Sequence, residues 1–171
     1  MTNDNTPNPY GWKRSMRAGL SFRPVAEDDM PFLARVYAST GREALAATAL
    51  NELQKAGILL LQFRAQHAHF QQHYPQADML VVMGGGHDIG RLYLARWPNR
   101  HGIIDLTLLP EFRRHGAGEV LLRDLTEEAA AAAKDVTILV DKFNPAMRLL
   151  RRLGFVTEED KGAHDLMRWS A

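Results

Sequence analysis

Hydrophobic and polar positions along the chain follow strand and helix periods that succeed one another in a definite order. Alternating or continuous apolar runs, which are typical of strands, occur at residues 20–25, 79–83, 89–95, 103–109, 136–140, 155–157 and 164–169. Apolar positions spaced three to four apart, which are typical of helices, begin near Asp28, span about 51–73, follow Gly116 and cover 146–153. The order β-α-α-β-β-β-α-β-α-β-β predicts an α/β domain in which helices flank a mixed sheet.

The helix expected at about 51–73 carries apolar side chains on more than one side. Those that we expect to pack in the core are Leu53, Leu60, Leu61, Phe63 and Phe70. The same segment contains His67, His69 and His73, of which only the last two have the spacing of zinc ligands on a helix. We therefore expect surface histidines there and no metal site.

The first 19 residues lack any hydrophobic period. They combine Asn, Pro, Gly and Ser with scattered basic residues, a composition that predicts a flexible tail. Tyr10 and Trp12 are the only large aromatic side chains in this segment, and an unpacked tail is favoured over their docking. Residues 20–171 are then expected to form a single domain, since their number suits one well-buried core.

Composition narrows the classes of function. The net charge of +1 gives no global field that would attract nucleic acid or an anionic membrane. The absence of cysteine excludes disulfides, thiolate metal sites and a cysteine nucleophile. No apolar run reaches the about 18 residues that a membrane helix needs, and the polar start does not resemble a signal peptide. These features predict a cytoplasmic protein without nucleic-acid or membrane partners.

The run from Leu106 to Gly118 is the most informative segment for function. A strand pattern stops at Pro110, and a helix opens on the closely spaced Gly116 and Gly118. The first N–H groups of a helix have no intrahelical partner, and the helix dipole adds partial positive charge there. Glycines let a phosphate approach these groups closely, and neighbouring arginines add charge-assisted donors. The run therefore predicts a site for a pyrophosphate group.

Two motifs of this sequence resemble those of a known family. Arg113-Arg114-His115-Gly116-Ala117-Gly118 is similar to the Q/R-x-x-G-x-G/A signature of the GCN5-related N-acetyltransferases, the GNAT superfamily. The segment from Asn144-Pro145 to Gly154-Phe155 resembles that family's second element, N-P-x-x-x-L-Y-x-x-x-G-F. The likeness extends over about 20–169, with both motifs inside 103–155. It implies a GNAT-like fold, with a mixed and mostly antiparallel central sheet.

The resemblance implies an acetyl-CoA site at named positions. The backbone of Leu106 and Leu108 would pair with the pantetheine amides, and the N–H groups of residues 113–118 would hold the pyrophosphate. Asn144 matches the family position that reaches the pantetheine arm. A β-bulge near Leu106 would separate the strand at 103–109 from the strand at 136–140 and open a wedge for the cosubstrate.

The implied reaction is transfer of an acetyl group to a primary amine by direct attack in a ternary complex. The backbone N–H of Leu108 would stabilise the oxyanion. Asp105, on the opposite face of the strand, is either a general base or part of a structural hydrogen bond. Glu43, expected in the loop between the first two helices, would line the acceptor pocket. The acceptor is a small molecule or a peptide, and the C-terminal strands are a candidate dimer surface.

One position departs from the family pattern. Leu150 stands where many members carry a tyrosine that protonates the departing thiolate. Either the thiolate leaves unassisted or through water, or the chain binds acyl-CoA without turnover as a regulatory module. We favour the enzyme because the expected phosphate site is otherwise complete.

Other conspicuous features have ordinary structural explanations. Gly84-Gly85-Gly86 is expected to form a hairpin turn and not a nucleotide loop. Arg148, Arg151 and Arg152 lie off the apolar stripe of their helix and are expected to be solvated.

Overall fold

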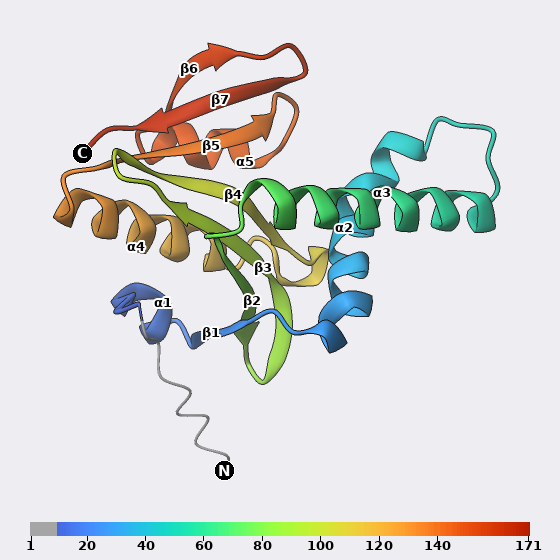
Figure 1. Cartoon of the computed structure of the whole chain (residues 1–171), viewed down its shortest axis with the longest axis horizontal. Coiled ribbons are helices and arrows are strands. Elements are labelled where there is room, and N and C mark those ends of the chain that lie inside the picture. The colour runs from blue at the N-terminus through green and yellow to red at the C-terminus, as the bar shows by residue number, and fades with distance from the viewer. Residues whose placement is uncertain (1–9) are drawn as a thin grey trace.

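The computed structural model describes residues 10–171, which form one seven-stranded sheet flanked by helices (Figure 1). The strand order is β1-β2-β3-β4-β5-β7-β6. The strands are β1 (Leu20–Pro24), β2 (Asp78–Gly84), β3 (His87–Arg96), β4 (Arg100–Leu108), β5 (Asp135–Asp141), β6 (Val156–Asp160) and β7 (His164–Trp169). Only β4 and β5 pair in parallel, so the sheet is mixed and mostly antiparallel, as the sequence predicts.

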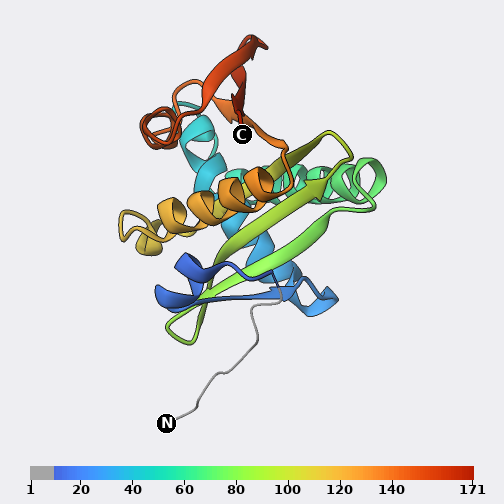
Figure 2. The same ribbon diagram turned by 90° about the vertical axis from the view of Figure 1, so that its left-hand side faces the viewer.

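Helices cover both faces of this sheet (Figure 2). The helices are α1 (Lys13–Arg17), α2 (Met30–Leu45), α3 (Glu52–His73), α4 (Ala117–Ala131) and α5 (Ala146–Arg152). Short 3-10 turns, η1 (Glu27–Asp29) and η2 (Pro110–Phe112), precede α2 and follow β4. The order of elements matches the order predicted from the sequence except for α1, which was not expected.

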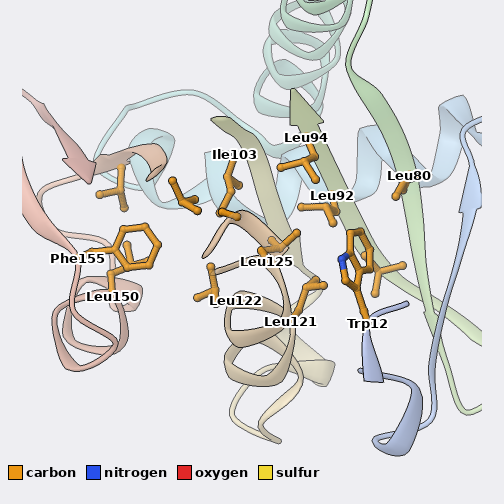
Figure 3. Close-up of a cluster of buried hydrophobic side chains, with 14 of the residues drawn as sticks. Trp12, Leu80, Leu92, Leu94, Ile103, Leu121, Leu122, Leu125, Leu150 and Phe155 are labelled. Carbon is orange, nitrogen blue, oxygen red and sulfur yellow. The ribbon is translucent and has the colours of Figure 1, made fainter. Parts of the chain in front are cut away.

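The larger core lies between the sheet and α4 (Figure 3). Leu121, Leu122 and Leu125 of α4 are buried against Leu92 and Leu94 of β3. These leucines follow the two periods that predicted the elements, three to four along the helix and two along the strand. Burying each such side chain contributes about 1.5–3 kcal/mol to the stability of the fold, so this core is a main source of stability.

The opposite face of the sheet packs against α2 and α3. Leu33 and Val36 of α2 and Leu59 and Phe63 of α3 are buried, together with Val81 of β2. The sequence predicted Phe63 correctly but placed Leu53, Leu60 and Leu61 in the core and missed Leu59, because four consecutive apolar residues at 58–61 offer no unique inward direction. Leu53, Leu60 and Leu61 are exposed, at 84%, 41% and 66%, whereas Leu59 and Phe63 share the inner stripe. The first half of α3 projects past the sheet in Figure 1, which leaves those leucines without a layer to pack on.

The N-terminal segment is part of the fold from Tyr10 onward. Trp12 is only 2% exposed and lies in the larger core (Figure 3). Its ring packs edge-on against Phe22. The buried carboxylate of Asp124 on α4 accepts the backbone N–H groups of Arg14 and Ser15 at 3.2 and 2.7 Å. The expected flexible tail therefore does not describe residues 10–19, and residues 1–9 lie outside the described part of the chain.

Two features predicted from glycine residues, a hairpin turn and a helix end, are present in the structure. Gly85 and Gly86, both with positive φ, form the β2–β3 hairpin turn. Gly154 ends α5 with φ +100, the left-handed conformation that a helix C-cap favours.

No helix within residues 10–171 has the length and apolar character needed to cross a lipid bilayer.

Candidate functional site

The centre of the sheet opens where β4 and β5 part. Their parallel pairing runs only from Arg100 with Asp135 to Ile103 with Ile138. On the other side of β4, Tyr93 pairs with Asp105 and Leu94 pairs with Ile103, so one extra residue of β4 bulges between them. The bulge predicted near Leu106 is confirmed, and β4 and β5 stop pairing just before the position at which the sequence predicts a wedge.

The last residues of β4 direct backbone groups into this opening. The N–H of Leu109 donates to the carbonyl of Ile89 on β3 at 2.8 Å. Along an antiparallel strand, the backbone N–H and C=O groups of successive residues point alternately toward the partner strand and away from it. Since Leu109 points toward β3, the N–H and C=O groups of Leu108 and Leu106 point away from it. That is the side from which β5 has departed, so these groups are available to an extended ligand.

The loop before α4 presents a cluster of unbonded N–H groups. Arg114 and Gly116 have positive φ angles of 63° and 84°, a backbone shape in which successive N–H groups converge on a concave surface. Within residues 10–171, the N–H groups of 114–119 donate no hydrogen bond, and the helical pattern begins only with Val120 to Gly116 at 3.0 Å. No atom lies within 4 Å of the position that a Cβ would take at Gly116. Free N–H groups of this kind beside the positive end of a helix dipole are the features that favour a bound anion.

The side chains of this loop divide into two groups. Those of Arg114 and His115 are exposed. The guanidinium of Arg113 is half buried and bound by the protein itself, with Nε donating to the Leu108 carbonyl at 2.8 Å and Nη2 donating to Ser39 Oγ at 3.3 Å. The sequence indicated two arginines facing the phosphate, and it gave no signal for these contacts.

Asp105 lies on the face of β4 opposite Leu106 and is held by two neighbours. Arg91 Nε and Nη2 donate to its two carboxylate oxygens at 3.2 and 2.9 Å, and Thr107 Oγ1 donates to Oδ1 at 2.7 Å. The Arg91 side chain is 3% exposed. Burial opposes its charge, but the Asp105 carboxylate outweighs burial and raises the pKa of Arg91. The structural hydrogen bond weighed from the sequence is therefore present, in the form of a buried ion pair.

Polar groups from α3 and β3 surround this ion pair. Gln66 Oε1 accepts from Arg91 Nη2 at 2.8 Å. The Tyr93 hydroxyl and the His67 Nδ1 atom are buried and have no hydrogen-bond partner among residues 10–171. Burial raises the pKa of Tyr93, and burial together with the Arg91 charge lowers the pKa of His67. The expectation of surface histidines thus holds for the exposed His69 and His73 and is wrong for His67.

Three further residues singled out from the sequence occupy distinct places. Glu43 is exposed, but it lies in the last turn of α2 and not in the following loop, one turn beyond Ser39. Asn144 Oδ1 accepts the N–H of Ala146 at 2.9 Å, which caps the start of α5. Leu150 is 1% exposed and packs in the larger core near Phe155 (Figure 3).

The family comparison covers most of these elements. The family model described as "Acetyltransferase (GNAT) family" matches residues 44–155, which is more than half of the chain. That span includes β4, the loop of unbonded N–H groups and α5. No protein in the curated comparison matches the chain.

Solved structures share the fold at low sequence identity. The PaiA N-acetyltransferase of Thermoplasma acidophilum in complex with coenzyme A superposes with a TM-score of 0.66 at 16% identity, over 89% of this chain and 99% of its own. An acetyltransferase of Thermus thermophilus gives 0.61 at 20% identity, covering 89% and 97%. A GNAT acetyltransferase of Elizabethkingia anophelis with bound acetyl-CoA gives 0.57 at 14% identity, covering 90% and 99%.

Proposed function

Because the chain belongs to the acetyltransferase (GNAT) family, we propose that it moves an acetyl group from acetyl-CoA to a primary amine by direct attack in a ternary complex. The observation that carries the proposal is the row of unbonded N–H groups at 114–119, at the end of a strand whose outward backbone is also available. The relatives from Thermoplasma acidophilum and Elizabethkingia anophelis are described with coenzyme A and acetyl-CoA bound.

The residues present suit the chemical groups of acetyl-CoA. The N–H groups of Arg114-His115-Gly116-Ala117-Gly118 would hold the diphosphate, with the exposed Arg114 adding positive charge. The N–H of Arg113, which the sequence also assigned to the diphosphate, already donates to the carbonyl of Pro110 at 3.2 Å. The N–H and C=O groups of Leu106 and Leu108 would pair with the pantetheine amides as a neighbouring strand would. Asn144 would reach the same arm through its side-chain nitrogen, since its oxygen already caps α5.

The catalytic contribution of the chain is mainly one of position and charge. Acetyl-CoA supplies the activated acetyl group and a thiolate that leaves when the C–S bond breaks. The Leu108 N–H acts as a backbone donor to the negative charge that develops on the carbonyl oxygen. Asp105 accepts, through water, the proton that the amine loses as its N–C bond forms, because Oδ2 accepts only one hydrogen bond from the protein. Glu43 borders the acceptor side.

A second function is favoured by one observation. Leu150 occupies the core position of the family tyrosine, so no phenol there protonates the thiolate. A chain that binds acyl-CoA without turnover would have the same loop and the same leucine.

A thiol-release assay separates the two functions. The protein is mixed with acetyl-CoA and a panel of primary amines that includes small amines, polyamines, amino acids and peptides, and free thiol is measured against protein without amine. Release above hydrolysis with any amine supports the transferase and eliminates the binding module. Coenzyme A affinity by calorimetry without any release favours the module, and the absence of coenzyme A affinity overturns both.

A further inference from the structure

Arg113 joins three parts of the proposed site that are far apart in the sequence or belong to different elements. Its backbone directly precedes the unbonded N–H groups of residues 114–119. Its Nε donates to the carbonyl of Leu108, the last residue of β4, at 2.8 Å. Its Nη2 donates to Ser39 Oγ on α2 at 3.3 Å, and Ser39 in turn donates to the carbonyl of Val36 at 2.6 Å.

The Leu108 carbonyl is not an arbitrary acceptor. It belongs to the outward row of β4 backbone groups, because the hydrogen bonds to β3 are made by the residues on either side of it. A carbonyl oxygen has two lone pairs, so the Arg113 bond leaves room for one further donor. The contact therefore fixes the distance and the angle between the end of β4 and the start of the loop without closing the strand to a ligand.

The charge of Arg113 has no acidic partner in the part of the chain that the structure describes. None of the ion pairs among residues 10–171 includes its guanidinium, although the side chain is half buried. A half-buried cation that bonds only to a carbonyl and a hydroxyl is held in one geometry. Arginine is suited to this role because its planar fork bonds to two acceptors at once.

We infer that Arg113 is a positioning residue, which sets the spacing between the outward groups of β4 and the N–H groups of residues 114–119. The inference rests on the proposed function. A ligand that joins a diphosphate to an amide-bearing arm needs both sets of groups in the correct register, whereas a diphosphate alone needs only the loop. Arg113 thereby selects for the complete, extended cosubstrate, and its side chain is not a phosphate ligand.

Two ligands test this role. Coenzyme A carries both the diphosphate and the pantetheine arm, whereas 3′-phospho-ADP carries the same nucleotide and diphosphate without the arm. Calorimetric Kd values are measured for both ligands with the wild-type protein and with Arg113→Gln. We expect the variant to lose about tenfold in affinity for coenzyme A, the scale of one charge-assisted hydrogen bond, and to bind 3′-phospho-ADP nearly as the wild type does.

Two more variants serve as controls. Arg113→Lys keeps the charge but has no planar fork, and we expect it to show the same selective loss as Arg113→Gln. Arg114→Gln removes an exposed charge beside the loop, and we expect it to weaken both ligands by a similar factor. Thermal unfolding of each variant shows that the fold is retained.

The outcomes distinguish this inference from the proposed function. An equal loss for both ligands in Arg113→Gln would make Arg113 a direct phosphate ligand and overturn the inference, while leaving coenzyme A binding by the wild type intact. Unchanged coenzyme A affinity in Arg113→Gln, or full recovery in Arg113→Lys, would also overturn it. A wild-type protein that binds neither ligand would overturn the proposed function and this inference with it.

Discussion

At the scale of single residues, the chemistry of a side chain depends on neighbours that the sequence does not reveal. Asp105 lies on the expected face of β4, but its carboxylate is engaged by Arg91 from the adjacent strand and by Thr107. Alternation along β4 predicts the face on which a side chain lies. It does not predict that a buried arginine on β3, Arg91 opposite Thr107, reaches the carboxylate diagonally, because that requires the pairing register.

The buried ion pair gives a prediction for stability. Asp105→Ala leaves the Arg91 guanidinium, 3% exposed, without its counter-charge, so we expect a loss of about 3–5 kcal/mol in the free energy of unfolding. Urea denaturation measures the loss. The double variant Arg91→Met with Asp105→Leu removes both charges and is expected to be more stable than Asp105→Ala alone. Wild-type stability in Asp105→Ala would contradict the role of this pair.

Leu150 gives a second prediction at the same scale. Restoring the family residue with Leu150→Tyr forces a phenol into a filled core position, which costs about 1–3 kcal/mol. We expect a lower unfolding temperature and no faster thiol release, because a ring at this buried position must be accommodated among the core side chains. A faster rate with unchanged unfolding temperature would show that the phenol reaches the reaction site.

At the scale of elements, the loop and the first turn of α4 are where sequence and structure agree best. The glycine spacing predicted free N–H groups at a helix start, and the structure has them at residues 114–119. This agreement arises because the feature is local: positive φ at Gly116 and the missing bonds of a helix N-terminus depend on a few consecutive residues.

A substitution in this loop tests its role. Gly116→Asp places a carboxylate, which hydrogen-bonds N–H groups and repels phosphate, in open space at φ +84°. We expect coenzyme A affinity to fall by about a hundredfold or more, measured by calorimetry. The positive φ strains the new side chain, so we expect a modest fall in unfolding temperature. Gly162→Asp is the matched control, because Gly162 has φ +87° and the same open surroundings in the β6–β7 turn. Equal affinity in both variants would show that the loop does not hold the ligand.

At the scale of the whole molecule, ionisable groups are buried on both sides of the sheet. His101 of β4 is 5% exposed at the side chain, and burial lowers its pKa, as it does for His67 on the other side. A hydrogen bond from Arg23 lowers the pKa of Asp29. Burial would raise the pKa of Glu128, but hydrogen bonds from Arg96 and Trp12 outweigh it and lower the pKa.

These shifts predict that acid destabilises the protein in two stages. A buried histidine with a lowered pKa adds its full contribution to the free energy of unfolding above the ordinary histidine pKa of 6.5. That contribution is lost as the pH falls below 6.5 toward the pKa of the folded state. Asp29 and Glu128 add to the free energy of unfolding above the ordinary pKa values of carboxylates. They lose that contribution as the pH falls through their lowered pKa values. Urea unfolding between pH 8 and pH 3 measures both stages, and His101→Gln is expected to reduce the first. Stability that stays constant or rises from pH 7 to pH 5 would contradict the prediction.

Sequence patterns failed where an element depends on distant partners. The five-residue helix α1 is too short to be stable alone, and it is ordered by Asp124, more than one hundred residues away, and by the insertion of Trp12 into the core. In α3, the apolar run at 58–61 fits several inward directions, and packing on α2, where Leu59 lies against Gly41, decided that Leu59 is buried.

The sequence by itself determined the order of strands and helices, the hairpin turn at Gly85 and Gly86 and the free N–H groups before α4, because short-range periodicity and glycine conformation are encoded in neighbouring residues. Tertiary structure decided which charges meet and which side chains are buried. The bond from Arg113 to Leu108, the contact of Arg113 with Ser39 and the ion pair of Arg91 with Asp105 exist only once strands and helices are in register. Contacts of this kind depend on the three-dimensional path of the chain, which no local pattern contains.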